Sequence, residues 1–185
     1  MALIKIGTRG SDLALWQANF VKNKLENLGC EVEIHIIKTQ GDKIQHLSFD
    51  KLEGKGFFTK EIEDALLDES IDLAVHSLKD LETNQPHGLE IVAVSDREDP
   101  SDILVIKKHA YDPTKQLMLK ENAIVGTSSV RRKAILNAFR SDLNITDLRG
   151  NVPTRINKLK SGNYDAIILA KAGLKRLKIN LSNFH

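Results

Sequence analysis

A short pattern that occurs twice in the chain predicts an α/β architecture. Residues 4–9 (IKIGTR) and 123–128 (AIVGTS) each form an apolar, strand-like run that ends in Gly-Thr. A segment with apolar residues at helical spacing follows in both places, after Ser11 in the first and after Ser128 or Ser129 in the second. Serine is a preferred N-cap residue. A strand that leads into a capped helix is the unit from which α/β sheets are built.

A second pair of stretches repeats in the same order. Residues 71–75 (IDLAV) and 164–168 (YDAII) each place an acidic residue before a buried strand. The two pairs together predict two similar α/β lobes, joined near the charged segment 95–101, which contains Pro100. We therefore expect a first lobe over residues 1–97 and a second lobe over residues 98–185.

Strand and helix signals alternate along the rest of the chain. Strands are predicted over residues 3–6, 32–36, 71–75, 89–94, 103–106, 124–125, 145–148 and 166–170. Helices are predicted after the N-cap candidates Ser11, Thr59, Ser129 and Asn151, and Gly29 is expected to stop the first of them. Val130, Ala134, Ile135 and Ala138 are expected to form the buried face of the third helix. Residues 40–56 form a long, polar, glycine-containing stretch that is either a functional loop or a solvated one.

Composition sets the class of protein. Lys and Arg number 27 and Asp and Glu 25, so the net charge of +2 does not favour nucleic acid as a partner. The single cysteine, Cys30, allows neither an intrachain disulfide nor a cysteine zinc cluster, and it is expected to be a small apolar filler. No signal-peptide pattern or membrane-length apolar run is present, and no spacing suggests a metal site, so we expect a cytoplasmic protein that binds no membrane.

The most polar strand end lies in residues 73–80 (LAVHSLKD). An imidazole, a hydroxyl, an ammonium and a carboxylate follow one another within His76–Asp80. Ligands of open α/β sheets bind at the carboxyl ends of the strands, so chemistry is expected here. The alternative is that Lys79 and Asp80 simply begin a solvated loop. His76 is either a general base or, as is more common at a strand end, a structural hydrogen-bonding residue.

Arginines accompany both Gly-Thr segments. Arg9 lies in the first half, and the second half has Arg131, Arg132, Arg149 and Arg155. Arginine binds carboxylates bidentately, and helix N-termini favour anions. Each arginine alone could be a surface charge, but together at strand ends they predict a cleft for a small molecule with several carboxylates or phosphates. Asp80 would be the one acid in that site, able to stabilise a cation or to accept a ligand N–H.

The motifs in combination resemble those of the porphobilinogen deaminase (hydroxymethylbilane synthase) family. The matching segments are 6–11 (IGTRGS), 14–18 (ALWQA), 54–58 (GKGFF), 76–80 (HSLKD), 125–132 (VGTSSVRR), 148–155 (LRGNVPTR) and 165–174 (DAIILAKAGL). They cover nearly the whole chain in the right order. No single motif would identify the family, but the combination is highly specific.

The resemblance implies a fold like that of type 2 periplasmic binding proteins, with two lobes and a cleft between them. It also implies a transferase that condenses porphobilinogen units, with loss of ammonia, into the linear tetrapyrrole hydroxymethylbilane in porphyrin and haem biosynthesis. The family primes this reaction with a covalently held dipyrromethane cofactor. By resemblance, the partners are porphobilinogen and the growing oligopyrrole, and the protein is expected to be a monomer.

The resemblance also assigns roles to residues of this sequence. Asp80 would be the catalytic carboxylate that serves the pyrrole nitrogens. The cofactor-binding residues would be Ser77, Lys79, Asp80, Thr127, Ser128, Ser129, Arg131 and Arg132. The substrate-binding residues would be Arg9, Ser11, Lys55, Arg149, Asn151, Arg155 and, more loosely, Arg176, with Lys51 and Lys55 in a loop over the cleft.

Two departures from the family pattern stand out. Glu82 occupies a position where the family usually has proline, which alters the local turn but spares Asp80. The family also has a third, α+β domain with the cysteine that anchors the cofactor, and segments that return to complete the first lobe. We expect this chain to be an N-terminal portion without them, and Cys30 matches no anchor. The chain by itself is therefore expected to lack the covalent cofactor and turnover.

Two other classes of function compete with the transferase. One is a non-catalytic, two-lobed protein that binds carboxylates or other anions, such as a solute receptor or a sensing module. A solute receptor would normally carry an export signal, and a sensing module has no need of Asp80 among basic residues. The other is a fragment preserved only as a folding unit.

Overall fold

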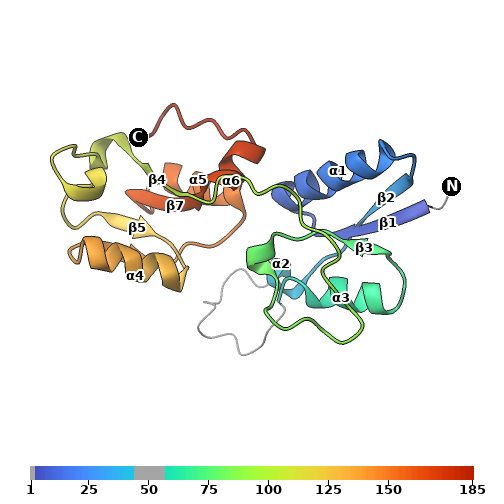
Figure 1. Ribbon diagram of the computed structural model, residues 1–185. Coiled ribbons are helices and arrows are strands. Elements are labelled where there is room, and N and C mark those ends of the chain that lie inside the picture. The colour runs from blue at the N-terminus through green and yellow to red at the C-terminus, as the bar shows by residue number, and fades with distance from the viewer. Residues whose placement is uncertain (1–2, 44–56) are drawn as a thin grey trace. The chain divides into compact units, whose positions relative to one another are not determined.

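The computed structural model describes residues 3–43 and 57–185. The chain forms two compact units, unit 1 (Met1–Asp96) and unit 2 (Arg97–His185). Strands and helices alternate in both units (Figure 1). Each unit is built around its own sheet, so each is described by itself.

Unit 1 contains a three-stranded parallel sheet in the order β2-β1-β3. Its elements are β1 (Leu3–Thr8), α1 (Asp12–Glu26), β2 (Glu31–Ile36), the short α2 (Gln40–Lys43), α3 (Lys60–Leu67), β3 (Leu73–Ala74) and the 3-10 turn η2 (Leu78–Asp80). The helix α1 covers one face of the sheet and α3 the other (Figure 1). The crossover from β1 to β2 and the crossover from β2 to β3 run in opposite directions along the sheet, so right-handed connections place their helices on opposite faces.

Local sequence signals determine where α1 begins and ends, as predicted. The Ser11 side chain accepts a hydrogen bond from the backbone N–H of Ala14 (3.4 Å), which makes it the N-cap of α1. The helix ends at Glu26, and Gly29 follows with a φ of 88°, a conformation that favours glycine. Leu28 lies beyond the last residue of the helix and is 80% exposed, although its spacing from Leu25 continues the apolar pattern of α1. Cys30 is a free thiol packed against the core of Ile6, Ala18 and Val32.

Unit 2 contains a four-stranded mixed sheet in the order β4-β7-β5-β6. Its elements are β4 (Asp102–Ile106), the 3-10 turns η3 (Lys108–Ala110) and η4 (Gln116–Met118), β5 (Ile124–Gly126), α4 (Val130–Phe139), β6 (Asn144–Thr146), α5 (Val152–Lys160), β7 (Ala166–Ala170) and α6 (Lys171–Arg176). The strands β5, β6 and β7 are parallel, and β4 runs antiparallel to β7. As a result β4 begins at the edge of the sheet where the other three strands end. We call this edge, where the parallel strands of a unit end, its carboxyl edge.

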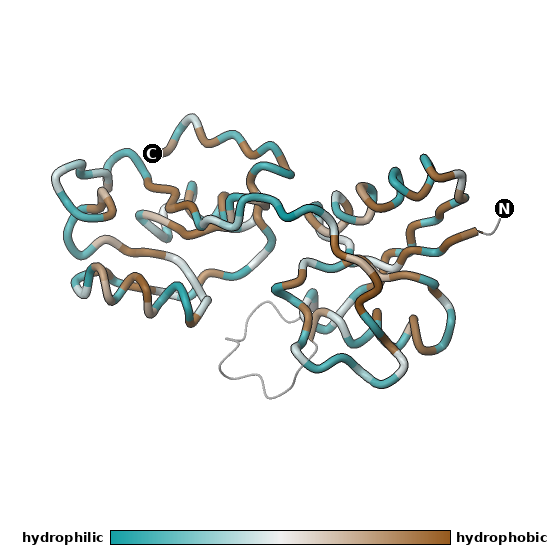
Figure 2. The backbone as a smooth tube through the Cα atoms, in the orientation of Figure 1, coloured by the Kyte–Doolittle hydropathy of each residue, from teal (hydrophilic) through white to brown (hydrophobic). Residues whose placement is uncertain are grey.

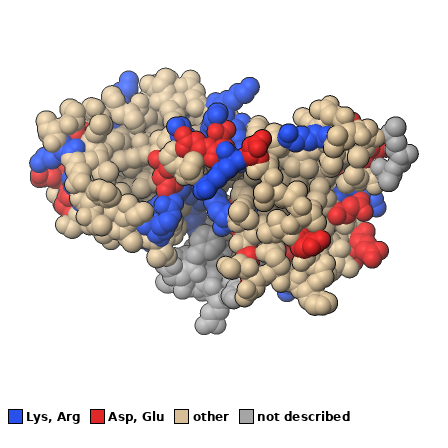
Figure 3. Space-filling view, in the orientation of Figure 1, with Lys and Arg blue, Asp and Glu red and all other residues tan. Residues whose placement is uncertain are grey.

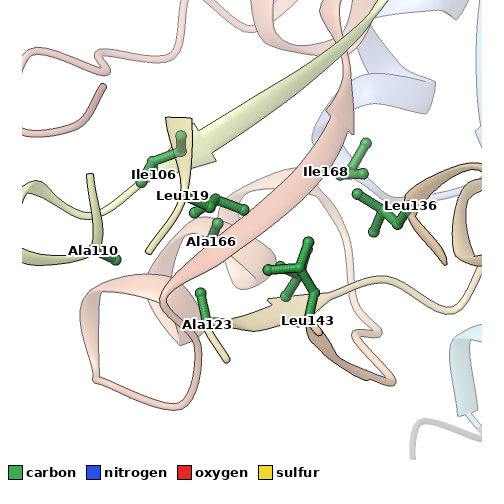
Figure 4. Packing of buried hydrophobic residues seen from close by; sticks show 9 residues of the cluster. Ile106, Ala110, Leu119, Ala123, Leu136, Leu143, Ala166 and Ile168 are labelled. Atoms are coloured by element: carbon green, nitrogen blue, oxygen red, sulfur yellow. The ribbon is translucent and has the colours of Figure 1, made fainter. Parts of the chain in front are cut away.

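The core of unit 2 lies on both faces of its sheet. Along β7, Ala166 and Ile168 face one cluster of buried residues, while Ile167 and Leu169 face the other. Figure 4 shows the first cluster, where Ile168 lies near Leu136 of α4. A strand buried on both faces has a continuous apolar sequence, and the apolar stretch of β7 is visible in Figure 2.

The two sheets share the same register and the same aspartate contacts. Ile6 pairs with Leu73 in unit 1, and Val125 pairs with Ala166 in unit 2. Just before β3, the Asp72 carboxylate accepts a hydrogen bond from the backbone N–H of Lys5 (2.8 Å). Just before β7, the Asp165 carboxylate accepts the same bond from Ile124 (2.8 Å). The predicted similarity of the two halves is therefore confirmed for the strand pairing and for these aspartate hydrogen bonds.

The glycine that β1 and β5 have at the same position has a steric explanation. A Cβ atom on Gly126 would lie 2.7 Å from the Tyr164 ring and 3.1 Å from the Cβ atom of Leu148. A Cβ atom on Gly7 would lie 2.2 Å from the side chain of Ile71. Ile71 and Tyr164 hold the same position before the shared aspartate, so a side chain at either glycine would meet the residue at that position.

Two predictions of secondary structure and burial are wrong. Residues 89–94 form no strand, and Val92 and Val94 are 67% and 74% exposed. A strand needs hydrogen bonds from a neighbour, and these residues have no partner strand in the described part of unit 1. On α4, Val130 is 71% exposed and Ala134, Ile135 and Ala138 are exposed as well, while Leu136 is buried. The less exposed side of α4 carries Arg132 and Leu136 and continues to the C-cap residue Arg140, because both guanidinium groups form ion pairs there, with Asp102 and Asp142.

Candidate functional site

The predicted site residues of unit 1 gather at the carboxyl edge of its sheet. Arg9 directly follows β1, and His76–Asp80 follow β3. Gly7 of β1 pairs with Ala74 of the parallel β3, so both strands end at the same level. This sheet therefore brings together an arginine and the polar stretch that are far apart in the sequence.

Asp80 is exposed at the end of a single helical turn. It is the last residue of η2, where its backbone N–H donates to the carbonyl oxygen of Ser77 (2.9 Å). Lys79, directly before it, is also exposed. The turn holds the main chain while the carboxylate and the ammonium group face solvent, so both side chains are available to a ligand.

Ser77 is linked to the first helix. The Gln17 side chain on α1 donates from Nε2 to the Ser77 hydroxyl (3.0 Å), and the hydroxyl lies 3.2 Å from the Oε1 atom of Gln17. The hydroxyl that begins the η2 turn is therefore oriented by a residue 60 positions earlier in the chain.

Arg9 is held by an aspartate and an aromatic ring. Its guanidinium forms an ion pair with Asp42 through Nη2, and its Nε lies 3.1 Å from the Asp42 Oδ1 atom. The guanidinium carbon lies 4.2 Å from the centre of the Phe58 ring, a cation–π contact. Thr39 donates its hydroxyl to the other Asp42 oxygen (2.8 Å). Burial raises the pKa of Asp42, but the hydrogen bonds from Arg9 and Thr39 and the positive charge of Arg9 outweigh it, and the pKa is lowered overall.

His76 is half-buried beside these charges. Burial lowers the pKa of its imidazole, the negative charge of Asp80 opposes this shift, and the positive charge of Arg9 adds to it. The net shift is downward, so His76 is neutral at pH 7. A neutral imidazole fits the structural role of His76. The expectation that Asp80 is the one acid among these residues is wrong, because Asp42 forms an ion pair with Arg9.

This shift predicts a pH effect on the stability of unit 1. With a folded pKa below the unfolded value of about 6.5, stability is complete above that pH and falls as pH decreases below it. Replacing His76 with Gln should remove part of the stability loss between pH 7.5 and 5.5. Urea denaturation followed by fluorescence of Trp16, the single tryptophan, measures this unit. His87→Gln is the control, and an equal loss in the wild type and His76→Gln would contradict the prediction.

The predicted site residues of unit 2 also lie at the carboxyl edge of their sheet. Thr127, Ser128 and Ser129 join β5 to α4. Thr127 is buried, and its hydroxyl oxygen accepts a hydrogen bond from the backbone N–H of Ser129 (3.3 Å). The Ser128 hydroxyl donates to the Leu148 carbonyl (3.2 Å) and accepts from the Leu148 N–H (3.0 Å). Ser129 occupies the N-cap position of α4, but its side chain makes no capping hydrogen bond.

Arg131 and Arg132 converge on one carboxylate. Arg131 Nη2 lies 2.8 Å from the Oδ2 atom of Asp102, and Arg132 Nη2 lies 2.5 Å from the Oδ1 atom. Arg132 also donates from Nη1 to the Ile168 carbonyl (3.1 Å). Its side chain is only 11% exposed, whereas that of Arg131 is 63% exposed. The buried Nε atom of Arg132 has no hydrogen-bond partner in the described part of the chain.

The remaining arginines lie on the second half of unit 2. Arg149 follows β6 and is half-buried, and Arg155 on α5 donates from Nε to the Gly150 carbonyl (2.7 Å). Asn151 is the N-cap of α5 as predicted, and its side chain accepts from the Thr154 N–H (2.9 Å). Arg176 ends α6.

The acidic residues that precede β4 form ion pairs with two further lysines of unit 2. Glu98 pairs with Lys175 (2.9 Å), and Asp99 pairs with Lys171 (2.5 Å), both on α6. The hydrogen bonds from Lys171 and Ser101 hold the pKa of Asp99 well below its usual range. Figure 3 shows acidic and basic side chains close together over the part of unit 2 that includes α6. Residues 98–102 therefore contain three carboxylates, of Glu98, Asp99 and Asp102, that form ion pairs with four cationic side chains: Lys175, Lys171, Arg131 and Arg132.

Some residues at the carboxyl edges of the two sheets were not predicted from the sequence, and two predicted lysines lie outside the described residues. Gln17, Asp42 and Asp102 fix Ser77, Arg9 and the arginine pair, but each lies far along the chain from its partner, and no local pattern indicated them. Lys51 and Lys55 lie outside the described residues. Within residues 3–43 and 57–185, no cluster of three or more histidine, cysteine or acidic side chains could hold a metal, and no helix is long and apolar enough to cross a bilayer.

Comparison with known proteins gives one consistent family. The family model described as "Porphobilinogen deaminase, dipyromethane cofactor binding domain" matches residues 4–184. The porphobilinogen deaminase of a Nitratiruptor species is 54% identical over 95% of this chain. That of Sulfurimonas denitrificans is 50% identical over 97% of it. The chain spans about half the length of these relatives, 56% in both cases.

Solved structures with a similar fold are distant in sequence. The periplasmic VFT2 domain of BvgS from Bordetella pertussis aligns with 98% of this chain and 72% of its own, with a TM-score of 0.52 at 11% identity. The periplasmic aliphatic sulphonate binding protein SsuA from Escherichia coli covers 96% of this chain and 57% of its own, with a TM-score of 0.51 at 13% identity. Both have the two-lobed fold of type 2 periplasmic binding proteins, which confirms the predicted fold class.

Proposed function

This chain belongs to the porphobilinogen deaminase family, and we propose that it supplies the catalytic acid and the carboxylate-binding residues that join porphobilinogen units into hydroxymethylbilane. The observation that carries the proposal is the exposed Asp80 carboxylate at the carboxyl edge of unit 1, where Lys79 directly precedes it and the charges of both Asp80 and Arg9 act on His76. An acid kept among cations has little use in simple anion binding. It suits a reaction in which the ligand itself becomes positively charged.

The residues of unit 2 fit the dipyrromethane cofactor that the family binds. This group carries several carboxylates, and guanidinium groups bind carboxylates through paired N–H donors. Arg131 and Arg132 each already donate one N–H to a carboxylate, that of Asp102. The buried Nε–H of Arg132 and the Ser129 hydroxyl, which makes no cap, are further donors at the start of α4. When bound, the cofactor supplies the pyrrole carbon to which the first substrate unit is joined.

We assign the remaining residues by the ligand group that each can reach chemically. Ser77 and Lys79 would bind carboxylates of the cofactor, together with Thr127 and Ser128 through their hydroxyl or backbone groups. Acetate and propionate groups of porphobilinogen and of the growing chain would be held by cationic and polar residues: Arg9, Ser11, Lys55, Arg149, Asn151, Arg155 and Arg176. Monomeric action in the cytoplasm remains a prediction of the sequence.

Asp80 would act as ammonia leaves. The C–N bond of the protonated aminomethyl group of porphobilinogen breaks, and its electron pair departs with the nitrogen as ammonia. The positive charge that remains on the substrate spreads to its pyrrole N–H. The Asp80 carboxylate would accept a hydrogen bond from that N–H, which stabilises the charge until the methylene carbon bonds to the next pyrrole and the proton of the attacked carbon is lost. Nearby Arg9 would hold a substrate carboxylate and so fix the ring in place.

The experiment is a turnover assay on the full-length protein that contains this chain. Incubation with porphobilinogen should release one ammonia per unit joined. The protein should also give the colour reaction of a bound dipyrromethane with an acidic aldehyde reagent. Porphobilinogen that is bound without ammonia release and without the colour reaction would favour the non-catalytic anion-binding function instead.

A further inference from the structure

The Asp102 carboxylate lies between two arginines to which sequence and family assign a carboxylate-binding role. We propose that Asp102 is a positioning residue, which fixes Arg131 and Arg132 in the geometry that binds the carboxylates of the dipyrromethane. This inference rests on the proposed function, because it takes the arginine pair as a cofactor-binding site.

Asp102 is itself firmly placed. It is the first residue of β4 and pairs in register with Ala170 of β7, so its backbone belongs to the sheet. Since β4 is antiparallel to β7, its first residue lies at the carboxyl edge, beside the start of α4. A carboxylate on a strand end is a more rigid support than one on a loop.

The two arginines need such a support. Neighbouring residues on an α-helix point about 100° apart, so Arg131 and Arg132 have no intrinsic reason to serve one ligand. In the structure each contributes an Nη2 atom to a different oxygen of Asp102. Arg132 is fixed a second time by the Ile168 carbonyl (3.1 Å), whereas Arg131 is 63% exposed and has no second hydrogen bond to a described residue. Without Asp102, Arg131 would lose the contact that directs it toward Arg132.

Removal of the Asp102 charge should raise ligand affinity if Asp102 competes with ligand anions, and lower it if Asp102 positions the arginines, so the two roles can be distinguished. Burial raises the pKa of Asp102, but the hydrogen bonds from Arg132 and Arg131 outweigh it, so the carboxylate is charged at neutral pH. The three side chains together carry a net charge of +1. If Asp102 merely competed with ligand anions, removing its charge would strengthen ligand binding. If it positions the arginines, its removal weakens binding even though the site becomes more positive.

The test uses the full-length protein that contains this chain, prepared without its cofactor, and a synthetic dipyrromethane with acetate and propionate side chains, titrated by calorimetry. Asp102→Asn keeps the size of the side chain and removes its charge. We expect its affinity to fall by up to about tenfold, since the long side chain of Arg131 must then be ordered by the ligand itself. Asp102→Glu keeps the charge but moves the carboxylate by one methylene group, and its affinity should fall severalfold.

Asp147→Asn is the matched control. Asp147 forms an ion pair (2.7 Å) with Lys133, which lies on α4 next to the two arginines. Asp147→Asn therefore removes one negative charge from unit 2, as Asp102→Asn does, without changing a partner of Arg131 or Arg132. Its affinity should stay close to that of the wild type. Circular dichroism checks that each variant is folded, and if Asp102→Asn is unfolded, Asp102→Glu decides alone.

The outcomes separate the two levels of inference. If the wild type does not bind the dipyrromethane, the proposed function of the arginine pair fails. If the wild type binds but both folded Asp102 variants bind equally well or more tightly, only the positioning role is overturned. Weaker binding by both variants, with the Asp147→Asn control unchanged, supports it.

Discussion

Replacement of Asp80 by asparagine is expected to slow hydroxymethylbilane formation by about 10²–10⁴-fold, the range found when one charge-stabilising or proton-transferring group is removed. The amide keeps the size of the side chain but not the negative charge. Because Asp80 is exposed and only its backbone N–H bonds within the η2 turn, the melting temperature should be nearly unchanged. The loss should therefore appear in the rate and not in the stability.

The measurement is the initial rate of product formation by the full-length protein, with cofactor content determined for each variant. Glu82→Gln serves as the control, because it removes one carboxylate two residues further along the same segment. A rate for Asp80→Asn within a few-fold of the wild type, at equal cofactor content, would refute the role of Asp80.

Replacement of Arg132 by glutamine is expected to weaken the binding of the synthetic dipyrromethane by at least about thirtyfold. Losing one partner of a charged, well-buried hydrogen-bonded pair typically costs about 2–5 kcal/mol. Arg132 is the less exposed of the two arginines, at 11%, and two of its donors are already fixed by Asp102 and Ile168. Its remaining N–H groups are therefore held in place for a ligand carboxylate.

Lys133→Gln is the control for this variant. Lys133 is the next residue on α4, and its ammonium group pairs with Asp147. If Lys133→Gln weakens binding as much as Arg132→Gln does, the effect is one of general charge. The specific role of Arg132 would then be wrong.

Local sequence signals predicted most of the fold. The N-caps Ser11 and Asn151 depend only on a side chain and a backbone N–H three residues away, so they could be identified without tertiary information. The repeated Gly-Thr and acidic signals also proved structural. Asp72 and Asp165 make the same hydrogen bond in the two units, and the glycines leave room for the residue before each aspartate.

What could not be predicted depends on distant partners. Residues 89–94 have the composition of a strand but no neighbour to pair with in the described part of unit 1. The direction of β4 is decided by its pairing with β7, which lies more than 60 residues later in the chain. Arg132 and Arg140 reversed the expected burial of α4, because carbonyl groups far away in sequence accept hydrogen bonds from their guanidinium groups in a half-buried position.

The candidate site divides in the same way. Its ligand-binding candidates lie in motifs that the sequence contains as continuous segments, such as 76–80 and 125–132. The residues that hold those candidates in place do not. Asp42 reaches Arg9 from 33 positions away, and Asp102 reaches Arg132 from 30. Motif reading therefore finds groups that touch a ligand more easily than the groups that orient them.

The central claim is that this chain provides the acid and the anion-binding residues for stepwise joining of pyrrole units. Intact-mass spectrometry of the full-length protein after brief exposure to porphobilinogen tests it most directly. We predict a ladder of masses, each step equal to one porphobilinogen minus one ammonia, and no ladder for Asp80→Asn. An unchanged protein mass under conditions where porphobilinogen is bound would contradict the account.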